Sequence, residues 1–184
     1  MQWNIPNTLT ITRLLLIPLI LYLFLSESSD YRMIAAFLFL FAILTDFLDG
    51  LFARYMKQHT NFGEFLDPIA DKLLVILVLS LLLTENKNIL FVLPSLIIIT
   101  REFLVIAIRQ RLAELGEKVL IKVMYFSKIK TAFQMISLFL LLYNGTIFTL
   151  DSYFLGTIFL QVASILTIIS FVYYVNKSWS LIVK

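Results

Sequence analysis

The chain has 184 residues, 60% of them hydrophobic, a mean hydropathy of +0.93 and a formal net charge of +3 at pH 7. Soluble domains are close to half apolar, so this composition predicts an integral membrane protein, and the small net charge disfavours a nucleic-acid partner. The absence of cysteine excludes disulfides and thiolate ligands, and a single histidine excludes a multi-histidine zinc site, so any bound metal must be held by oxygen.

Six apolar segments have the length, about 17 to 25 residues, that a helix needs to cross a bilayer. We expect helices at 9–25, 33–54, 68–84, 89–109, 130–143 with some preceding residues, and 153–175. The start of the fifth merges into the basic stretch 118–130, which is also compatible with an interfacial edge. No repeat or linker divides the chain, so we expect one all-α domain over residues 1–184, with six transmembrane helices.

The termini and the basic residues predict how the chain is oriented. Residues 1–10 carry no Lys or Arg, and no small-residue cleavage site follows, so we expect no signal peptide and read the whole chain as mature protein. Of the fifteen Lys and Arg residues, only Arg32 and Lys87 fall on one side of the predicted membrane, and the other thirteen share the side of both termini. Because Lys and Arg gather on cytoplasmic loops, we expect both termini at the cytoplasmic face of the inner membrane, with Trp3 and Trp179 as interfacial anchors.

Four aspartates and several small residues span the second and third segments. The sequence there reads Asp46-x-x-Asp49-Gly50-x-x-Ala53-Arg54, then eight residues, then Gly63-x-x-x-Asp67-x-x-x-Asp71. On a helix, positions 46, 49, 50 and 53 fall within an arc of about 100° and share a face, where the small residues let a helix or a ligand approach closely. Asp67 followed by Pro68 predicts a helix N-cap, and Asp71 projects from the same side one turn later.

Two interpretations of these four carboxylates are open. They are ordinary helix-end residues paired with Arg54, Lys57 and Lys72, or they bind a hard cation, since ionised side chains are expensive in an apolar chain. The spacing favours the second interpretation, with Mg²⁺ or Mn²⁺ as the ion, room for two ions, and phosphate chemistry as the use. His59 is expected to be a solvated loop residue rather than a nucleophile or base.

A second group of charges belongs to the fourth and fifth segments. Arg101 and Glu102 follow about a dozen apolar residues, roughly 18 Å along a helix, and are therefore expected within the cytoplasmic half of the membrane. Glu102 is either functional or part of an ion pair with Arg109 or Lys72. Together, Arg101, Arg109, Lys128 and Lys130 form a candidate cradle for a second phosphate, carried by an acceptor substrate. The remaining basic residues Arg111, Lys118 and Lys122 are expected to contact anionic lipid.

The acidic pattern D-x2-D-G-x2-A-R-x8-G-x3-D-x3-D resembles the signature of the CDP-alcohol phosphotransferases and matches every fixed position of it. The resemblance implies that family's membrane fold of six helices, usually as a homodimer, and an enzyme that displaces CMP from a CDP-linked substrate with an alcohol. It also implies Mg²⁺ or Mn²⁺ held by Asp46, Asp49, Asp67 and Asp71. By the same correspondence, Asp71 doubles as general base, and Gly50, Ala53 and Arg54 contact the cytidine diphosphate.

Three further stretches are similar to one branch of that family, the bacterial phosphatidylglycerophosphate synthases. They are Asn4-Ile5-Pro6-Asn7-x-Leu9-Thr10-x-x-Arg13, Thr100-Arg101-Glu102-Phe103 with Arg109, and Lys128-x-Lys130-Thr131; Ser127 departs from the glycine usual in relatives. The similarity implies transfer of the phosphatidyl group of CDP-diacylglycerol to sn-glycerol 3-phosphate. The phosphate of the acceptor would then be held by Arg109 and Lys130 together with Lys128 and Arg101, while Asn7, Thr10 and Arg13 line the cytidine or pyrophosphate side.

Two other functions fit parts of the sequence. A relative with another acceptor, such as inositol phosphate or phosphatidylglycerol, shares the acidic motif, and a lipid acceptor would not need the cradle formed by Lys128 and Lys130. A carboxylate-lined transporter is the alternative from a different class. A transporter relay usually spreads its acids through the membrane, whereas all four aspartates here are expected at one end, which favours the enzyme.

Overall fold

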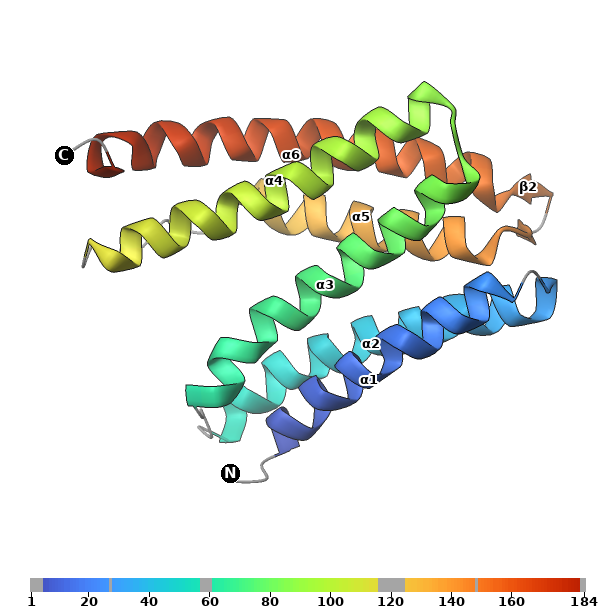
Figure 1. Cartoon of the computed structure of the whole chain (residues 1–184), viewed down its shortest axis with the longest axis horizontal. Helices are drawn as coiled ribbons and strands as arrows, with labels where there is room; N and C mark the ends of the chain where they lie inside the picture. Colours follow the sequence, from blue (N-terminus) through green and yellow to red (C-terminus); the bar gives the residue numbers. More distant parts are fainter. Residues whose placement is uncertain (1–4, 27, 57–60, 116–124, 148, 183–184) are drawn as a thin grey trace.

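Figure 1 shows long helices that run back and forth along one axis, with both chain termini at the same end. This computed structural model describes the backbone of residues 5–26, 28–56, 61–115, 125–147 and 149–182, and their side chains except those of 5–9, 46–56, 61–68, 113, 125–128 and 180–182. The described residues form the helices α1 (Ile5–Leu25), α2 (Ser29–Met56), α3 (Asn61–Glu85), α4 (Ile89–Glu114), α5 (Tyr125–Tyr143) and α6 (Ser152–Ile182). A short antiparallel hairpin, β1 (Thr146–Ile147) and β2 (Leu150–Asp151), joins α5 to α6.

Each apolar segment identified in the sequence is a helix, and most of them extend beyond the apolar stretch. Long runs of Leu, Ile and Phe carry α1 and α4 through the internal prolines Pro18 and Pro94. A proline inside a helix removes one backbone hydrogen bond, and packing against neighbouring helices compensates for that loss. The polar residues at the start of α2 and at the end of α6 are also helical.

The prediction that Asp67 caps the third helix is wrong, because α3 begins six residues earlier, at Asn61. Asparagine is itself a favoured residue at a helix start. Pro68 is therefore inside α3 rather than at its first position. An Asp-Pro pair is typical of a helix N-terminus, but here the residues before it are already helical.

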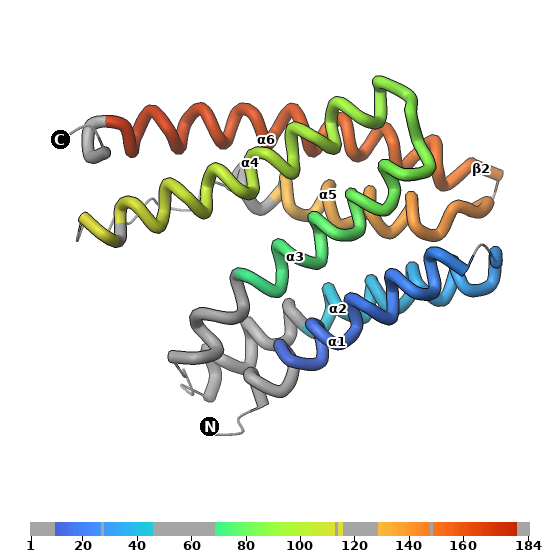
Figure 2. The backbone as a smooth tube through the Cα atoms, viewed as in Figure 1, coloured from blue at the N-terminus to red at the C-terminus, as the bar shows by residue number. Residues whose placement is uncertain are grey.

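The helix α3 crosses obliquely between two layers of the bundle. Figure 2 shows α4, α5 and α6 on one side and α1 and α2 on the other, and α3 contacts α1, α4 and α5. The α5–α6 pair forms the most extensive interface, and α2 packs on α5 to join the layers. The shared core is apolar, with Phe39, Leu79, Leu82, Leu138 and Leu160 fully buried. This arrangement brings residues of α3, α4 and α5 to a common point.

Basic residues that the structure describes lie at both ends of the bundle. Because helix direction alternates, Arg109 and Lys130, near the end of α4 and the start of α5, lie toward the end that holds the termini. Arg32 and Lys87 lie at the opposite end, near the α1–α2 and α3–α4 connections. For these four residues, the fold agrees with the two sides that the sequence predicts.

The surface of the helices suits a lipid environment. Within the described residues, Ile89–Leu112 and Ser152–Trp179 are long and apolar enough to cross a membrane, and Thr10–Leu25 and Ile129–Tyr143 are shorter apolar helices. Large apolar side chains are exposed along several helices, among them Leu15, Phe37, Leu93, Phe103 and Ile165. Soluble monomers rarely expose apolar surface so widely, so these faces are expected to contact lipid.

Gly156 allows α5 and α6 to pack closely. A Cβ atom at this position would lie 2.8 Å from Leu141 Cγ and 3.2 Å from Leu140 Cβ, and the Gly156 carbonyl accepts a 2.7 Å hydrogen bond from Ser137 Oγ. Small residues in membrane helices permit such an approach. We therefore predict that Gly156→Ala forces the helices apart and lowers the free energy of unfolding by about 1–3 kcal/mol, an overpacking cost.

Thermal unfolding of the purified protein in detergent measures this loss. Gly145→Ala is the matched control, because Gly145 lies beyond the end of α5, and the atoms nearest to a Cβ there belong to the ring of Tyr143, 2.9 Å away at Cε1, and not to the α5–α6 interface. We expect Gly145→Ala to change the unfolding temperature much less. Equal effects from the two substitutions would contradict the packing explanation.

Candidate functional site

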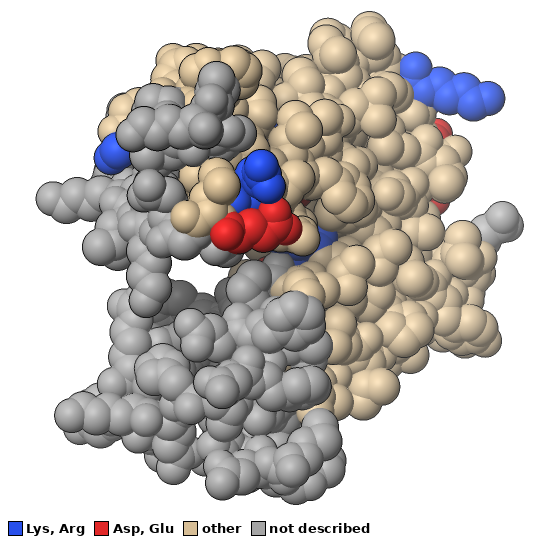
Figure 3. Space-filling model, turned by 60° about the vertical axis from the view of Figure 1, so that its left-hand side comes forward, with Lys and Arg blue, Asp and Glu red and all other residues tan. Residues whose placement is uncertain are grey.

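A polar cavity of about 180 Å³ lies where α3, α4 and α5 meet. Its walls are formed by Asp71, Lys72, Val75, Arg101, Glu102, Lys130, Thr131, Gln134 and Met135. Asp71 and Lys72 come from α3, Arg101 and Glu102 from the middle of α4, and Lys130 from the start of α5. Figure 3 shows acidic and basic side chains side by side at the centre of one face, where most of the other described surface is uncharged. The fold thus gathers charges from three helices into one place.

Glu102 is the centre of an ion-pair network in this cavity. Its Oε1 accepts hydrogen bonds from Lys130 Nζ at 2.7 Å and from a terminal nitrogen of Arg101 at 2.8 Å. Its Oε2 lies 3.5 Å from Lys72 Nζ. The sequence suggested either Arg109 or Lys72 as an ion-pair partner of Glu102, and the structure contains the pair with Lys72. Three cations surround one carboxylate, so this group of side chains has an excess of positive charge.

Asp71 lies at the same cavity and pairs with a residue from another helix. Arg13 of α1 donates a hydrogen bond to Asp71 Oδ1 at 2.5 Å. The Arg13 side chain is 1% exposed, whereas that of Asp71 is 37% exposed, so the carboxylate remains accessible from the cavity. Thr10, one turn before Arg13, is also fully buried. Two residues predicted for the nucleotide side, Thr10 and Arg13, therefore lie on the helix that contacts the predicted base.

Burial makes the Arg13–Asp71 pair and the Glu102 network costly, because removing charges from water is only partly offset by their mutual attraction. Replacing such pairs with apolar residues is often neutral or stabilising. Charged clusters of this kind inside a membrane protein are by default functional candidates. Arg101 also keeps capacity for a ligand, since its Nε is buried and has no hydrogen-bond partner among the described residues.

The rest of the acidic motif is placed by the backbone alone. The helix α2 continues through Met56, so positions 46, 49, 50 and 53 share one of its faces, as predicted. Asp67 precedes Asp71 by one turn of α3. The side chains of Asn7, Asp46, Asp49, Gly50, Ala53, Arg54, Asp67 and Lys128 lie outside the described residues. Among the side chains that are described, no three acidic or histidine groups lie close enough to hold a metal.

The predicted phosphate cradle is brought together in part. Arg101 and Lys130 line the cavity with Asp71, whereas Arg109 is exposed and does not line it. Arg109 lies eight residues after Arg101, about 12 Å further along α4. Two further residues line the cavity: Lys72, expected from the sequence only as an ion-pair partner, and Gln134, which no motif indicated. Lys72 directly follows Asp71, and Gln134 lies one helical turn after Lys130, so both positions could have been found from the sequence.

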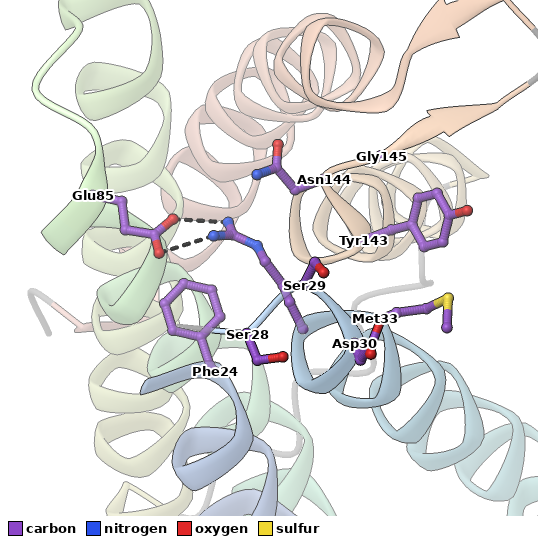
Figure 4. Close-up of a pocket in the computed structure, with 10 residues that line it drawn as sticks. Phe24, Ser28, Ser29, Asp30, Met33, Glu85, Tyr143, Asn144 and Gly145 are labelled. Atoms are coloured by element: carbon purple, nitrogen blue, oxygen red, sulfur yellow. Dashed lines mark hydrogen bonds and ion pairs between the residues drawn. The ribbon is translucent and has the colours of Figure 1, made fainter. Parts of the chain in front are cut away.

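A larger cavity, of about 570 Å³, lies at the opposite end of the bundle. Arg32 of α2 is paired through both terminal nitrogens with Glu85 of α3, at 2.9 and 2.8 Å. Figure 4 labels Glu85 and marks the two interactions of its carboxylate with dashed lines. Arg32 Nε also donates to the Leu142 carbonyl at the end of α5, and its guanidinium lies over the ring of Phe24. These contacts satisfy the arginine and join four helix ends, so we assign this pair a structural role.

Comparison with known proteins gives a consistent result. Residues 3–180 match the family model described as CDP-alcohol phosphatidyltransferase. The chain is 43% identical over 177 residues to a CDP-diacylglycerol–glycerol-3-phosphate 3-phosphatidyltransferase of Pseudomonas fluorescens, with 96% of this chain and 90% of the relative covered. It is 37% identical over 179 residues to the protein of the same description from Wigglesworthia glossinidia brevipalpis, with 97% of both chains covered. It is 38% identical over 178 residues to the one from Haemophilus influenzae, with 96% and 94% covered.

Proposed function

We propose that this chain, which belongs to the CDP-alcohol phosphatidyltransferase family, transfers the phosphatidyl group of CDP-diacylglycerol to sn-glycerol 3-phosphate and releases CMP. Relatives that carry this description match it over nearly its whole length. The structural observation that supports the proposal most strongly is the cavity in which Asp71 faces Arg101 and Lys130. A base and a group of cations in one small cavity suit an acceptor that has both a hydroxyl and a phosphate.

Asp71 is proposed as the general base of the transfer. Its accessible carboxylate takes the proton of the acceptor's sn-1 hydroxyl as the oxygen attacks the phosphorus that bears diacylglycerol. The bond between this phosphorus and the oxygen of CMP breaks, and CMP leaves with the bonding electrons. Arg13 fixes the orientation of the carboxylate through its hydrogen bond to Oδ1.

The acceptor phosphate is proposed to bind Arg101 and Lys130. Both side chains line the cavity of Asp71, and charge-assisted hydrogen bonds from guanidinium and ammonium groups are the strong contacts for phosphate. Lys128, two residues before Lys130 in α5, is proposed as a further ligand of this phosphate. Arg109, further along α4 than Arg101, is also proposed as one. A neutral alcohol would make no use of the positive charge on Arg101 and Lys130 that Glu102, their shared partner, leaves uncompensated.

The family generally depends on a divalent metal, and the donor residues of this chain fit one. Asp71 offers carboxylate oxygen beside the cavity, and with no cysteine in the chain the donors are hard oxygen ligands, as Mg²⁺ and Mn²⁺ prefer. We propose Asp46, Asp49, Asp67 and Asp71 as its ligands, for one or two ions. When bound, such an ion neutralises charge on the diphosphate and makes CMP a better leaving group. Asn7, Thr10, Arg13, Gly50, Ala53 and Arg54 are proposed to contact the cytidine diphosphate.

The membrane arrangement is part of the proposal. Six membrane crossings, in a single catalytic domain, fit the six helices and their exposed apolar side chains. Because the basic residues gather at the end of the termini, that end and the active site are proposed to face the cytoplasm at the inner membrane. A homodimer is proposed from the family resemblance alone.

An acceptor panel tests the proposal. Purified protein in detergent is given CDP-diacylglycerol with glycerol 3-phosphate, inositol phosphate, phosphatidylglycerol or glycerol, and CMP release is measured. We expect kcat/KM to be at least about 100-fold higher for glycerol 3-phosphate than for glycerol, because a site built around a charged group rejects analogues that lack it. The assay is repeated with EDTA and with Mg²⁺ or Mn²⁺ restored, and activity is expected only with metal. Preference for another acceptor would overturn the substrate assignment, and full activity in EDTA would overturn the metal.

A further inference from the structure

The network around Glu102 contains one feature that binding of a phosphate does not require. A carboxylate in a phosphate site repels the ligand and competes for the same cations, yet Glu102 is 8% exposed and lies between Lys130, Arg101 and Lys72. The partners come from all three helices that form the cavity. A purely attractive phosphate site would leave this position uncharged, so the acidic side chain needs its own explanation.

Counting charges around the cavity provides that explanation. Among the described side chains that line the cavity, Lys72, Arg101 and Lys130 carry three positive charges, and Glu102 neutralises one, which leaves two. Asp71 does not enter this count, because Arg13 pairs with it. A phosphate monoester carries about 1.5 to 2 negative charges at neutral pH, whereas a phosphodiester carries one and a neutral alcohol none. The remaining charge therefore matches a monoester best.

Geometry supports the same conclusion. Like charges in a cavity of about 180 Å³ repel each other strongly, and long side chains without a fixed partner would turn outward. Glu102 holds Lys130 Nζ and Arg101 within 2.7 and 2.8 Å of the same oxygen, Oε1, before any ligand arrives. Binding groups that are already in position lower the cost of ordering them.

We propose that Glu102 is a positioning residue that sets both the spacing and the net charge of this cation cluster, and thereby selects a phosphate monoester as the acceptor. The proposal rests on the function proposed above and assigns a residue that acts through Lys130, Arg101 and Lys72 rather than on the substrate. The proposal explains why a buried carboxylate, that of Glu102, is present in a site that binds an anion. It also gives Lys72, the most distant of the three cations, a part in the charge balance.

The substitution Glu102→Gln tests the proposal, because glutamine keeps the size and removes the charge. We expect KM for glycerol 3-phosphate to rise about tenfold or more, with KM for CDP-diacylglycerol within about twofold of the wild type, and the preference for glycerol 3-phosphate over glycerol to fall. An unchanged or lower KM for glycerol 3-phosphate, or equal rises for both substrates, would overturn it. Failure of the wild type to use glycerol 3-phosphate would instead overturn the proposed function.

The double variant Lys72→Gln with Glu102→Gln separates charge balance from simple structural damage. It restores the wild-type excess of two positive charges, so we expect a lower KM for glycerol 3-phosphate than in Glu102→Gln alone. If Glu102 only held helices together, or if Lys72 were only a phosphate ligand, the second substitution would not improve binding, and that result would contradict the charge count.

Two further variants complete the experiment. Glu85→Gln removes the carboxylate of the Arg32 ion pair at the opposite end of the bundle, and we expect it to lower the unfolding temperature while leaving both KM values unchanged. Glu102→Asp keeps the charge on a shorter side chain and serves if Glu102→Gln cannot be purified. It should raise KM for glycerol 3-phosphate at least about threefold and leave KM for CDP-diacylglycerol unchanged, and wild-type values for both would overturn the proposal.

Discussion

Replacing Asp71 by asparagine is expected to reduce CMP release at least about 1,000-fold. Loss of a general base typically costs 100- to 10,000-fold, and Asp71 is also proposed as a metal ligand, so the upper part of that range applies. Asparagine has nearly the same shape, and its amide oxygen can still accept a hydrogen bond from Arg13, which now bonds to Asp71 Oδ1. The local fold should therefore persist while the basic oxygen is lost.

Two measurements make this prediction specific. CMP release reports the chemical step, and binding of a CDP-lipid, measured by thermal stabilisation of the purified protein, should stay largely intact. Asp30→Asn is the matched control, since Asp30 is an exposed residue in the first turn of α2, beside the large cavity at the opposite end. Near-normal turnover of the Asp71→Asn variant would remove this residue as the base.

Asp71 also illustrates how far the sequence could predict the site. Its place on a helix with an acidic partner one turn away follows from spacing, since helical periodicity is a local property. Arg101 and Lys130 were expected near it because cations that converge beside the acidic site can form a cradle for the phosphate of an acceptor. The cavity contains both, so the meeting of these three residues was predictable.

The partners of these residues were not predictable, because they depend on how the helices pack. Arg13 reaches Asp71 only because α1 contacts α3, and local spacing contains no information about that contact. Arg109 was expected beside Lys130, but eight residues on a helix rotate a side chain by about 80° and move it about 12 Å from Arg101. The start of α3 was misplaced because Asp67 and Pro68 form a start signal that a longer helix overrides.

The different positions of Lys130 and Arg109 in the folded chain suggest a test of Lys130. Lys130 is 3% exposed and lines the cavity, whereas Arg109 is exposed and lies outside it. We predict that Lys130→Gln reduces kcat/KM for glycerol 3-phosphate about 100-fold, since removing one partner of a buried charged hydrogen bond costs about 2–5 kcal/mol. The KM for CDP-diacylglycerol should change little, because the reduction arises in the acceptor site.

Arg109→Ala and Lys87→Gln complete this comparison. The first should weaken use of glycerol 3-phosphate less than Lys130→Gln does, but still more than use of the CDP-lipid. The second removes an exposed lysine at the opposite end and should leave all rates unchanged. Steady-state kinetics with each substrate varied in turn distinguishes the outcomes. Should Arg109→Ala prove the more damaging, the phosphate would bind nearer the end of α4, and the cavity of Asp71 would not be the acceptor site.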